Sequence, residues 1–280
     1  VVVIGGGTAG LEAACTAAEV GCNTFLLEKG NELGGLASLI SKIPAKNRLA
    51  DFPHYLMHRA EQLDNLYIFK NTEGTPENIR KFHPNIIVSS TGSAPLLPPI
   101  AGLKDRIDNE NHNIYSILGM ISHINNFPKD LEGKKVVVVG GGAVGLDVVE
   151  FFADRNADIS IVEMMDQIGR DLDPVSKNDT KTMMKKHNVH QLTKTALLEV
   201  KDSSFLVRGD GEPYELPFEY GFVCLGMRAQ GQLYQNLTEE FSSEDVEIMN
   251  IGDSQRARRI IDGTQEGRNI LTILEQKGYL

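Results

Sequence analysis

The sequence contains the same pattern of strand, glycine turn and helix twice. The β-branched run Val1–Ile4 leads into the glycine turn Gly5–Gly10, and an alanine-rich helix follows to about residue 20. Residues 134–139 and the turn Gly140–Gly145 repeat this order before a second helix. A continuous apolar, β-branched strand is typical of a parallel sheet that is covered on both faces. The repeat therefore predicts an α/β fold with two Rossmann-like dinucleotide-binding domains.

Each glycine turn has the form GxGxxG. The first glycine allows a tight bend, the second lets a phosphate approach the backbone, and the third lets the helix pack against the strand. The helix then directs free N–H groups and the positive end of its dipole towards the phosphates. One such turn alone is a weak indication, because glycine-rich turns are common. The candidate glycines are Gly5, Gly7 and Gly10 in the first copy and Gly140, Gly142 and Gly145 in the second.

An acidic residue follows each turn at the same spacing. Glu28 and Glu163 each lie eighteen residues after the last glycine, at the end of a second expected strand. A carboxylate at this place accepts hydrogen bonds from the ribose hydroxyls of an adenine dinucleotide. For Glu28 the plainer alternative is a solvated strand end. Glu163 favours NADH over NADPH because a carboxylate repels a 2′-phosphate, although Arg155 and Arg170 keep NADPH open.

The order of the expected strands inserts the second copy into the first domain. A buried strand ends at Thr91-Gly92, and residues 222–228, which include Gly226, form its counterpart in the second copy. With 280 residues the chain is long enough for two domains. We expect a discontinuous domain of residues 1–105 and 230–280, and an inserted domain of residues 106–229.

Composition and charge exclude several classes of protein. The hydrophobic share of 41% and the charged share of 24% are ordinary for a globular protein. No apolar run has membrane-spanning length, so we expect a cytoplasmic protein without a membrane partner. The net charge of −10 and the absence of a dense Lys/Arg run argue against nucleic acid. Three cysteines without a CxxC pair provide neither a 4Fe–4S cluster nor a redox-active disulfide, and we expect no metal site.

Two further glycine segments are candidates for cofactor contacts. Gly34-Gly35 follows the first acid and lets the backbone run close to a flat or charged group. Gly252-Asp253 follows the last expected strand. A carboxylate at such a strand end is costly unless it accepts hydrogen bonds from the backbone or from ligand hydroxyls. A plain helix N-cap is the alternative for Asp253.

These motifs occur in a familiar order. Together with Ile43–Lys46, Gly145–Asp147 and Arg258–Gly263, they resemble the C-terminal half of the 2,4-dienoyl-CoA reductase, enoate reductase and NADH:flavin oxidoreductase family of flavoprotein reductases. The resemblance covers essentially the whole chain. In that family this half binds FAD and NAD(P)H, and an N-terminal barrel binds FMN and a 4Fe–4S cluster. Because Val1 already belongs to the first expected strand and no cysteine cluster is present, we expect a fragment of a longer protein.

The resemblance assigns the candidate residues to two cofactors. It implies that residues 1–105 and 230–280 bind FAD and that residues 106–229 bind NADH. The FAD candidates are Gly5, Gly7, Gly10, Glu28, Gly35, Thr91, Gly92, Gly252 and Asp253, with Arg48 and Arg259 as weaker ones. The NADH candidates are Gly140, Gly142, Gly145, Glu163 and Gly226.

The expected activity is an electron transfer. A hydride would pass from NADH to FAD, and the electrons would pass on to an Fe–S/FMN partner domain that this chain lacks. That step needs no protein acid or base, so we assign no catalytic side chain. A stand-alone NADH:electron-carrier reductase and a non-catalytic ADP-binding scaffold are the alternatives. The intact Thr91-Gly92, Gly252-Asp253 and both acids argue against the scaffold. The final substrate and the oligomeric state, including a homo-oligomer, stay open.

Overall fold

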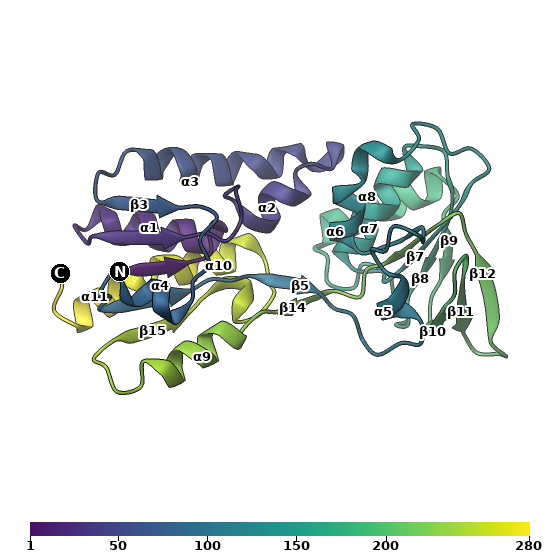
Figure 1. Ribbon diagram of the computed structural model, residues 1–280. Helices are drawn as coiled ribbons and strands as arrows, with labels where there is room; N and C mark the ends of the chain where they lie inside the picture. Colours follow the sequence, from purple (N-terminus) through teal and green to yellow (C-terminus); the bar gives the residue numbers. More distant parts are fainter. The chain divides into compact units, whose positions relative to one another are not determined.

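The computed structural model describes all residues, Val1–Leu280, and divides into two compact units (Figure 1). Unit 1 consists of residues 1–42, 46–94 and 227–280, and unit 2 of residues 43–45 and 95–226. Unit 2 is thus inserted into unit 1. The assignment of 1–105 with 230–280 to FAD, and of 106–229 to NADH, stays a prediction.

Unit 1 is built on a five-stranded parallel sheet with the strand order β15-β4-β1-β2-β3. The apolar residues of β1 and β4 are buried because helices pack on the sheet. Parallel pairing aligns the carboxyl ends of the strands, so the turns after β1, β2 and β4 lie at one edge. The strands are β1 (Val2–Ile4), β2 (Thr24–Leu27), β3 (Leu66–Phe69), β4 (Ile86–Ser89) and β15 (Glu247–Asn250).

Helix α1 (Thr8–Glu19) is the central helix of unit 1. Its alanines have little bulk, and residues 10–18 are all buried among neighbouring helices. A glycine in α10 allows that helix to pack tightly against α1, since a Cβ atom at Gly267 would lie only 2.6 Å from the Ala9 carbonyl oxygen. The other helices are α2 (Gly35–Ile40), η1 (Pro44–Ala50, of which Pro44 and Ala45 belong to unit 2), α3 (Asp51–Glu61), α4 (Pro76–Arg80), α9 (Gln232–Glu240), η3 (Gly252–Ser254), α10 (Ile260–Arg268) and α11 (Ile270–Gln276).

Unit 2 repeats this architecture on a second parallel sheet, with the order β6-β13-β7-β8-β9. Phe152 of α7 packs against Phe222 of β13, with ring centroids 4.8 Å apart. The strands are β6 (Ile114–Tyr115), β7 (Lys135–Val139), β8 (Asp158–Val162), β9 (His190–Leu192) and β13 (Tyr220–Val223). The helices are α5 (Leu103–Arg106), α6 (Ile117–Ser122), η2 (Ile124–Asn126), α7 (Ala143–Ala153) and α8 (Pro174–Lys186).

Two smaller sheets complete the structure. The antiparallel sheet of β10 (Ala196–Val200), β11 (Ser204–Arg208) and β12 (Tyr214–Pro217) belongs to unit 2 and forms a meander. Strands β5 (Ser93–Pro95) and β14 (Met227–Ala229) pair where the chain passes between the units. The predicted fold class, two Rossmann-like domains with one inserted, is therefore confirmed.

The last helical segment of the chain is interrupted. Helix α10 ends at Arg268 and α11 begins at Ile270. Asn269 lies between them as the C-cap of one helix and the N-cap of the other. None of the helices combines the length and the apolar character required to cross a bilayer.

Candidate dinucleotide-binding sites

The two glycine turns have the same backbone geometry. Gly5 and Gly140 have φ angles of +102° and +109°, which side-chain-bearing residues rarely adopt. Each N–H donates to the last carbonyl of the neighbouring strand, at 2.8 Å in both units. A Cβ atom at Gly10 would overlap the Gly5 carbonyl oxygen, and one at Gly145 would overlap that of Gly140. Only glycine fits at these close approaches.

The helix N-termini after both turns have the features of a phosphate site. Gly7 and Gly142 are the N-caps of α1 and α7, without a side-chain cap and without an acidic residue in the first turn. The first N–H groups of both helices are therefore open to an external acceptor. Beside Gly7, a Cβ atom would meet only the Gly35 Cα, at 3.9 Å. This open glycine cradle fits the diphosphate of a dinucleotide.

The two acids are held by the turns themselves. The Glu28 carboxylate is partly buried and accepts the N–H groups of Gly6 and Gly30 at 2.7 and 2.6 Å. Glu163 makes the same pair of bonds at 2.7 Å each. Its donors are the N–H groups of Gly141 and Met165. The Glu28 carboxylate is thus more than a solvated strand end. In both acids each carboxylate oxygen keeps a second lone pair that could accept a ribose hydroxyl.

The Gly34-Gly35 segment lies against the first turn. The Gly34 N–H donates to the Gly6 carbonyl at 2.7 Å. A Cβ atom on Gly35 would lie 3.0 Å from the Gly7 Cα. The structure therefore brings Gly5, Gly7, Gly10, Glu28 and Gly35 together at one edge of the sheet.

The segments after β4 and β15 also reach this region of unit 1. Gly252 lies against α1, because a Cβ atom there would be 2.8 Å from the Ala9 Cβ. Asp253 accepts hydrogen bonds from the Ser93 hydroxyl at 2.9 Å and from the Arg258 N–H at 3.1 Å. The N-cap of α10 is Arg259, so the interpretation of Asp253 as its N-cap is wrong.

Thr91 and Gly92 follow β4 directly. The Thr91 hydroxyl donates to the Gln230 carbonyl at 2.8 Å. Gly92 has a φ of +74°, and no atom lies within 4 Å of the place where its Cβ would stand. Gly226 in unit 2 resembles it, with a φ of +101° and the same open surroundings. The space in which a Cβ atom would stand is open at both glycines.

Two of the predicted residues lie apart from the rest. Arg48 is exposed and pairs with Asp51 at 3.4 Å. Arg259 is exposed and pairs with Asp262 in the first turn of α10, at 3.3 Å. Neither side chain bonds to the glycine turn or to Glu28, and local ion pairs account for both. Their roles in FAD binding stay predictions.

An ionic network around α1 is not among the sequence-based candidates. Glu12 is only 6% exposed, and its carboxylate accepts Arg59 Nη1 at 3.0 Å. Arg59, 12% exposed, also donates two hydrogen bonds to Glu19, at 2.5 and 2.7 Å. These bonds raise the pKa of Arg59 above its usual range and lower that of Glu19. The two acids of this alanine-rich helix could have indicated the network.

Thiol reactivity provides the first testable prediction. Burial raises the pKa of Cys15 to about 11 and that of Cys224 to about 12, so both stay protonated at neutral pH. With an aromatic disulfide reagent at about pH 8, we expect the native chain to release at most the equivalent that corresponds to Cys22. The unfolded chain should release three. Rapid release of three equivalents by the native chain would contradict the described burial.

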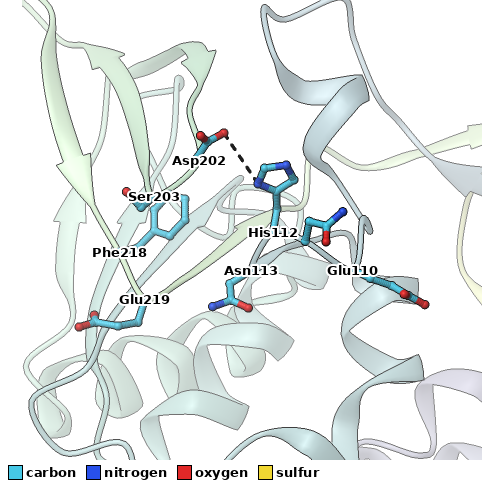
Figure 2. Close-up of a pocket in the computed structure, with 8 residues that line it drawn as sticks. Glu110, His112, Asn113, Asp202, Ser203, Phe218 and Glu219 are labelled. Carbon is cyan, nitrogen blue, oxygen red and sulfur yellow. Dashed lines mark ion pairs between the residues drawn. The ribbon is translucent and has the colours of Figure 1, made fainter.

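A pocket of about 360 Å³ lies elsewhere in unit 2 (Figure 2). His112 and Asp202, joined in Figure 2 by a dashed line, form an ion pair at 3.8 Å when the histidine is protonated. The pocket has no glycine turn and holds none of the predicted site residues, so we assign no nucleotide to it. Its lining consists of Glu110, Asn111, His112, Asn113, Asp202, Ser203, Phe218 and Glu219.

Comparison with known proteins identifies similar chains. The family described as pyridine nucleotide-disulphide oxidoreductase matches residues 1–249. An NADH oxidase of Thermoanaerobacter brockii is 28% identical over 268 residues, which are 95% of this chain and 40% of that protein. The structure of a 2-naphthoyl-CoA reductase has a TM-score of 0.81 at 23% identity, over 96% of this chain and 39% of the other. Thioredoxin reductase of T. acidophilum has a TM-score of 0.72 at 17% identity, over 98% of its own chain.

Proposed function

Since the chain belongs to the pyridine nucleotide-disulphide oxidoreductase family, we propose that it is a flavin-dependent reductase module. It is an oxidoreductase domain, with FAD and NADH as cofactors. In our proposal it transfers a hydride from NADH to FAD and passes the electrons on to an Fe–S/FMN partner domain. The bound flavin would supply the hydride-accepting chemistry, and the chain would supply binding and orientation.

The observation that carries this proposal is the duplicated hydrogen-bond pattern. Each unit presents an uncapped helix N-terminus, an open glycine and a carboxylate fixed by the turn. In unit 1 these groups would hold the diphosphate and the adenosine ribose of FAD. In unit 2 they would hold those of NADH. Two such arrangements in one chain favour a reaction between two dinucleotides over a scaffold that holds one nucleotide.

The proposed partner domain follows from length and from resemblance. The chain spans about two fifths of the length of the NADH oxidase and of the 2-naphthoyl-CoA reductase chain. The remaining part of such a protein would hold the FMN and 4Fe–4S groups that the resemblance implies. A disulfide acceptor within this chain is disfavoured, because Cys15 and Cys224 are buried and the three cysteines are free.

A stand-alone reductase for an electron carrier is the second candidate. It is favoured by the T. acidophilum thioredoxin reductase, whose chain is matched over 98% of its length. A fold of this size therefore serves as a whole reductase chain in that protein. Steady-state NADH oxidation by this chain with a single defined carrier would favour the second candidate.

An anaerobic visible spectrum tests the proposed function. The purified chain is reconstituted with FAD and titrated with NADH. We expect a flavin band at ~450 nm that NADH bleaches, because the hydride reduces the flavin. A chain that does not bind FAD but binds ADP would overturn the proposal in favour of a non-catalytic ADP-binding scaffold. A chain that binds FAD but keeps its colour with NADH would contradict the hydride transfer.

The two acids should separate the two sites. In Glu163→Ala, the turn loses two charge-assisted hydrogen bonds and the ribose loses its acceptor. We expect the KM for NADH to rise about tenfold or more, with FAD retained. In Glu28→Ala, the FAD content after purification should fall instead. Steady-state kinetics and FAD absorbance measure both effects, and unchanged NADH kinetics in Glu163→Ala would show that the acid is misplaced.

A further inference from the structure

We propose that Asp171 weakens the binding of the NADH diphosphate in unit 2, so that this nucleotide exchanges readily while FAD stays bound in unit 1. This inference rests on the proposed function. It concerns a residue outside the glycine motif and outside the acid that follows it. It would explain how two copies of one motif serve a resident cofactor and an exchangeable substrate.

The two units share the backbone that closes the glycine turn. The Gly34 N–H donates to the Gly6 carbonyl, and the Gly169 N–H donates to the Gly141 carbonyl, both at 2.7 Å. The chain therefore has the same register in both places. Leu36 of unit 1 corresponds to Asp171 of unit 2.

The charge beside the second glycine differs between the units. In unit 2, the position of a Cβ atom at Gly142 lies 3.9 and 4.0 Å from the two carboxylate oxygens of Asp171. In unit 1, the atom at the same distance from the Gly7 position is the uncharged Cα of Gly35. The backbone that receives the diphosphate thus has a carboxylate beside it in unit 2 and none in unit 1.

No hydrogen bond or ion pair from the protein engages the Asp171 carboxylate. The residue is exposed. Arg170 is the adjacent cation, but its side chain forms no ion pair with Asp171. Lys177 bonds through its Nζ atom to the Arg170 carbonyl at 2.9 Å. A diphosphate at Gly142 would therefore meet a negative charge at short range, against the attraction of the α7 N-terminus.

Repulsion of this kind is modest because water and salt screen exposed charges. Unit charges a few ångströms apart in water change an equilibrium constant several-fold. Such a change is large enough to separate tight from exchangeable binding and small enough to preserve the site. It should disappear as the ionic strength rises, because the screening length falls from about 10 Å at 0.1 M to about 3 Å at 1 M.

The test compares Asp171→Asn with Asp179→Asn, which removes an equal charge from an exposed residue of α8. The FAD-loaded chain is titrated with ADP-ribose, which has the adenosine and diphosphate of NADH but cannot donate a hydride. In low salt we expect Asp171→Asn to lower the Kd about three- to tenfold, and Asp179→Asn to leave it within about twofold. At about 1 M salt the Kd of Asp171→Asn should approach that of the wild type.

The outcomes separate this inference from the proposed function. If ADP-ribose binds but Asp171→Asn does not tighten it in low salt, the role of Asp171 is overturned and the NADH site stands. If both substitutions tighten binding equally, only net charge is involved, and the role of Asp171 is again overturned. If neither the wild type nor the variants bind ADP-ribose, the NADH site of the proposed function fails and the inference fails with it.

Discussion

Substitution of Gly145 by alanine should strongly weaken the proposed binding of NADH to unit 2 and leave the proposed binding of FAD to unit 1 unchanged. The new Cβ atom would overlap the Gly140 carbonyl oxygen. That carbonyl cannot move freely, because the Gly140 N–H is bonded to the Val162 carbonyl at 2.8 Å and its φ is already +109°. The N-terminus of α7 would have to shift away from the turn. We expect the affinity for NADH to fall by about two orders of magnitude, or about 2.7 kcal/mol.

Three measurements on the Gly145→Ala chain check this prediction. ADP-ribose titration gives the affinity, flavin absorbance gives the FAD content, and circular dichroism shows whether unit 2 is folded. Gly211→Ala is the matched control, because no atom lies within 4 Å of its Cβ position and its φ is not positive. Wild-type affinity in the folded Gly145→Ala chain would mean that the nucleotide does not use this turn.

Substitution of Arg59 by alanine should lower the free energy of unfolding of unit 1 by several kcal/mol. It leaves the Glu12 carboxylate buried with only the Thr16 hydroxyl, at 3.3 Å, and the more distant Arg268, at 3.6 Å. Removing one partner of a buried ion pair costs about 3 to 5 kcal/mol, since the remaining charge is not compensated. For a unit of this size, we expect the unfolding temperature of unit 1 to fall by about 6 to 20 °C. Differential scanning calorimetry measures the shift.

Arg268→Ala is the control for the ionic network. Its side chain is 66% exposed, and an exposed partner contributes about 1 kcal/mol or less to stability.

The pH dependence of the unfolding temperature provides a second measurement. The hydrogen bonds from Arg59 lower the pKa of Glu19, so this pair stabilises the folded chain above the unfolded pKa and loses its effect as pH falls through the folded pKa. The stability of Arg59→Ala should no longer contain this contribution from Glu19, so it should fall less as the pH is lowered. Equal decreases of the unfolding temperature in Arg59→Ala and Arg268→Ala would contradict the role of Arg59.

The fold and the glycine turns could be predicted because their requirements are local. A β-branched run, a GxGxxG turn and an acid eighteen residues later specify one backbone path, and the structure has it twice. The break at Asn269 was not predicted, since the apolar pattern continues through α11. Arg48 and Arg259 were chosen by resemblance alone, each makes a local ion pair, and their roles in FAD binding stay predictions.

The contacts that depend on distant residues could not be predicted. Glu12 and Arg59 are 47 residues apart, and only the packing of α3 on α1 brings them together. Asp171 lies beside Gly142 because the chain after β8 folds back over the turn, which no periodicity indicates. Sequence patterns specify the conformation of each segment, whereas tertiary packing decides which charges become neighbours.

The discontinuity of unit 1 has a consequence for the order in which the protein is made. Strand β4 cannot pair with β15, and α1 cannot pack against α10, until all of unit 2 has left the ribosome. Apart from its short segment 43–45, unit 2 is continuous and can complete its sheet earlier. The nascent chain would then hold a finished unit 2 while unit 1 is still incomplete. Under the proposed function, flavin loading would be among the last events of biosynthesis, after Gly252 has reached α1.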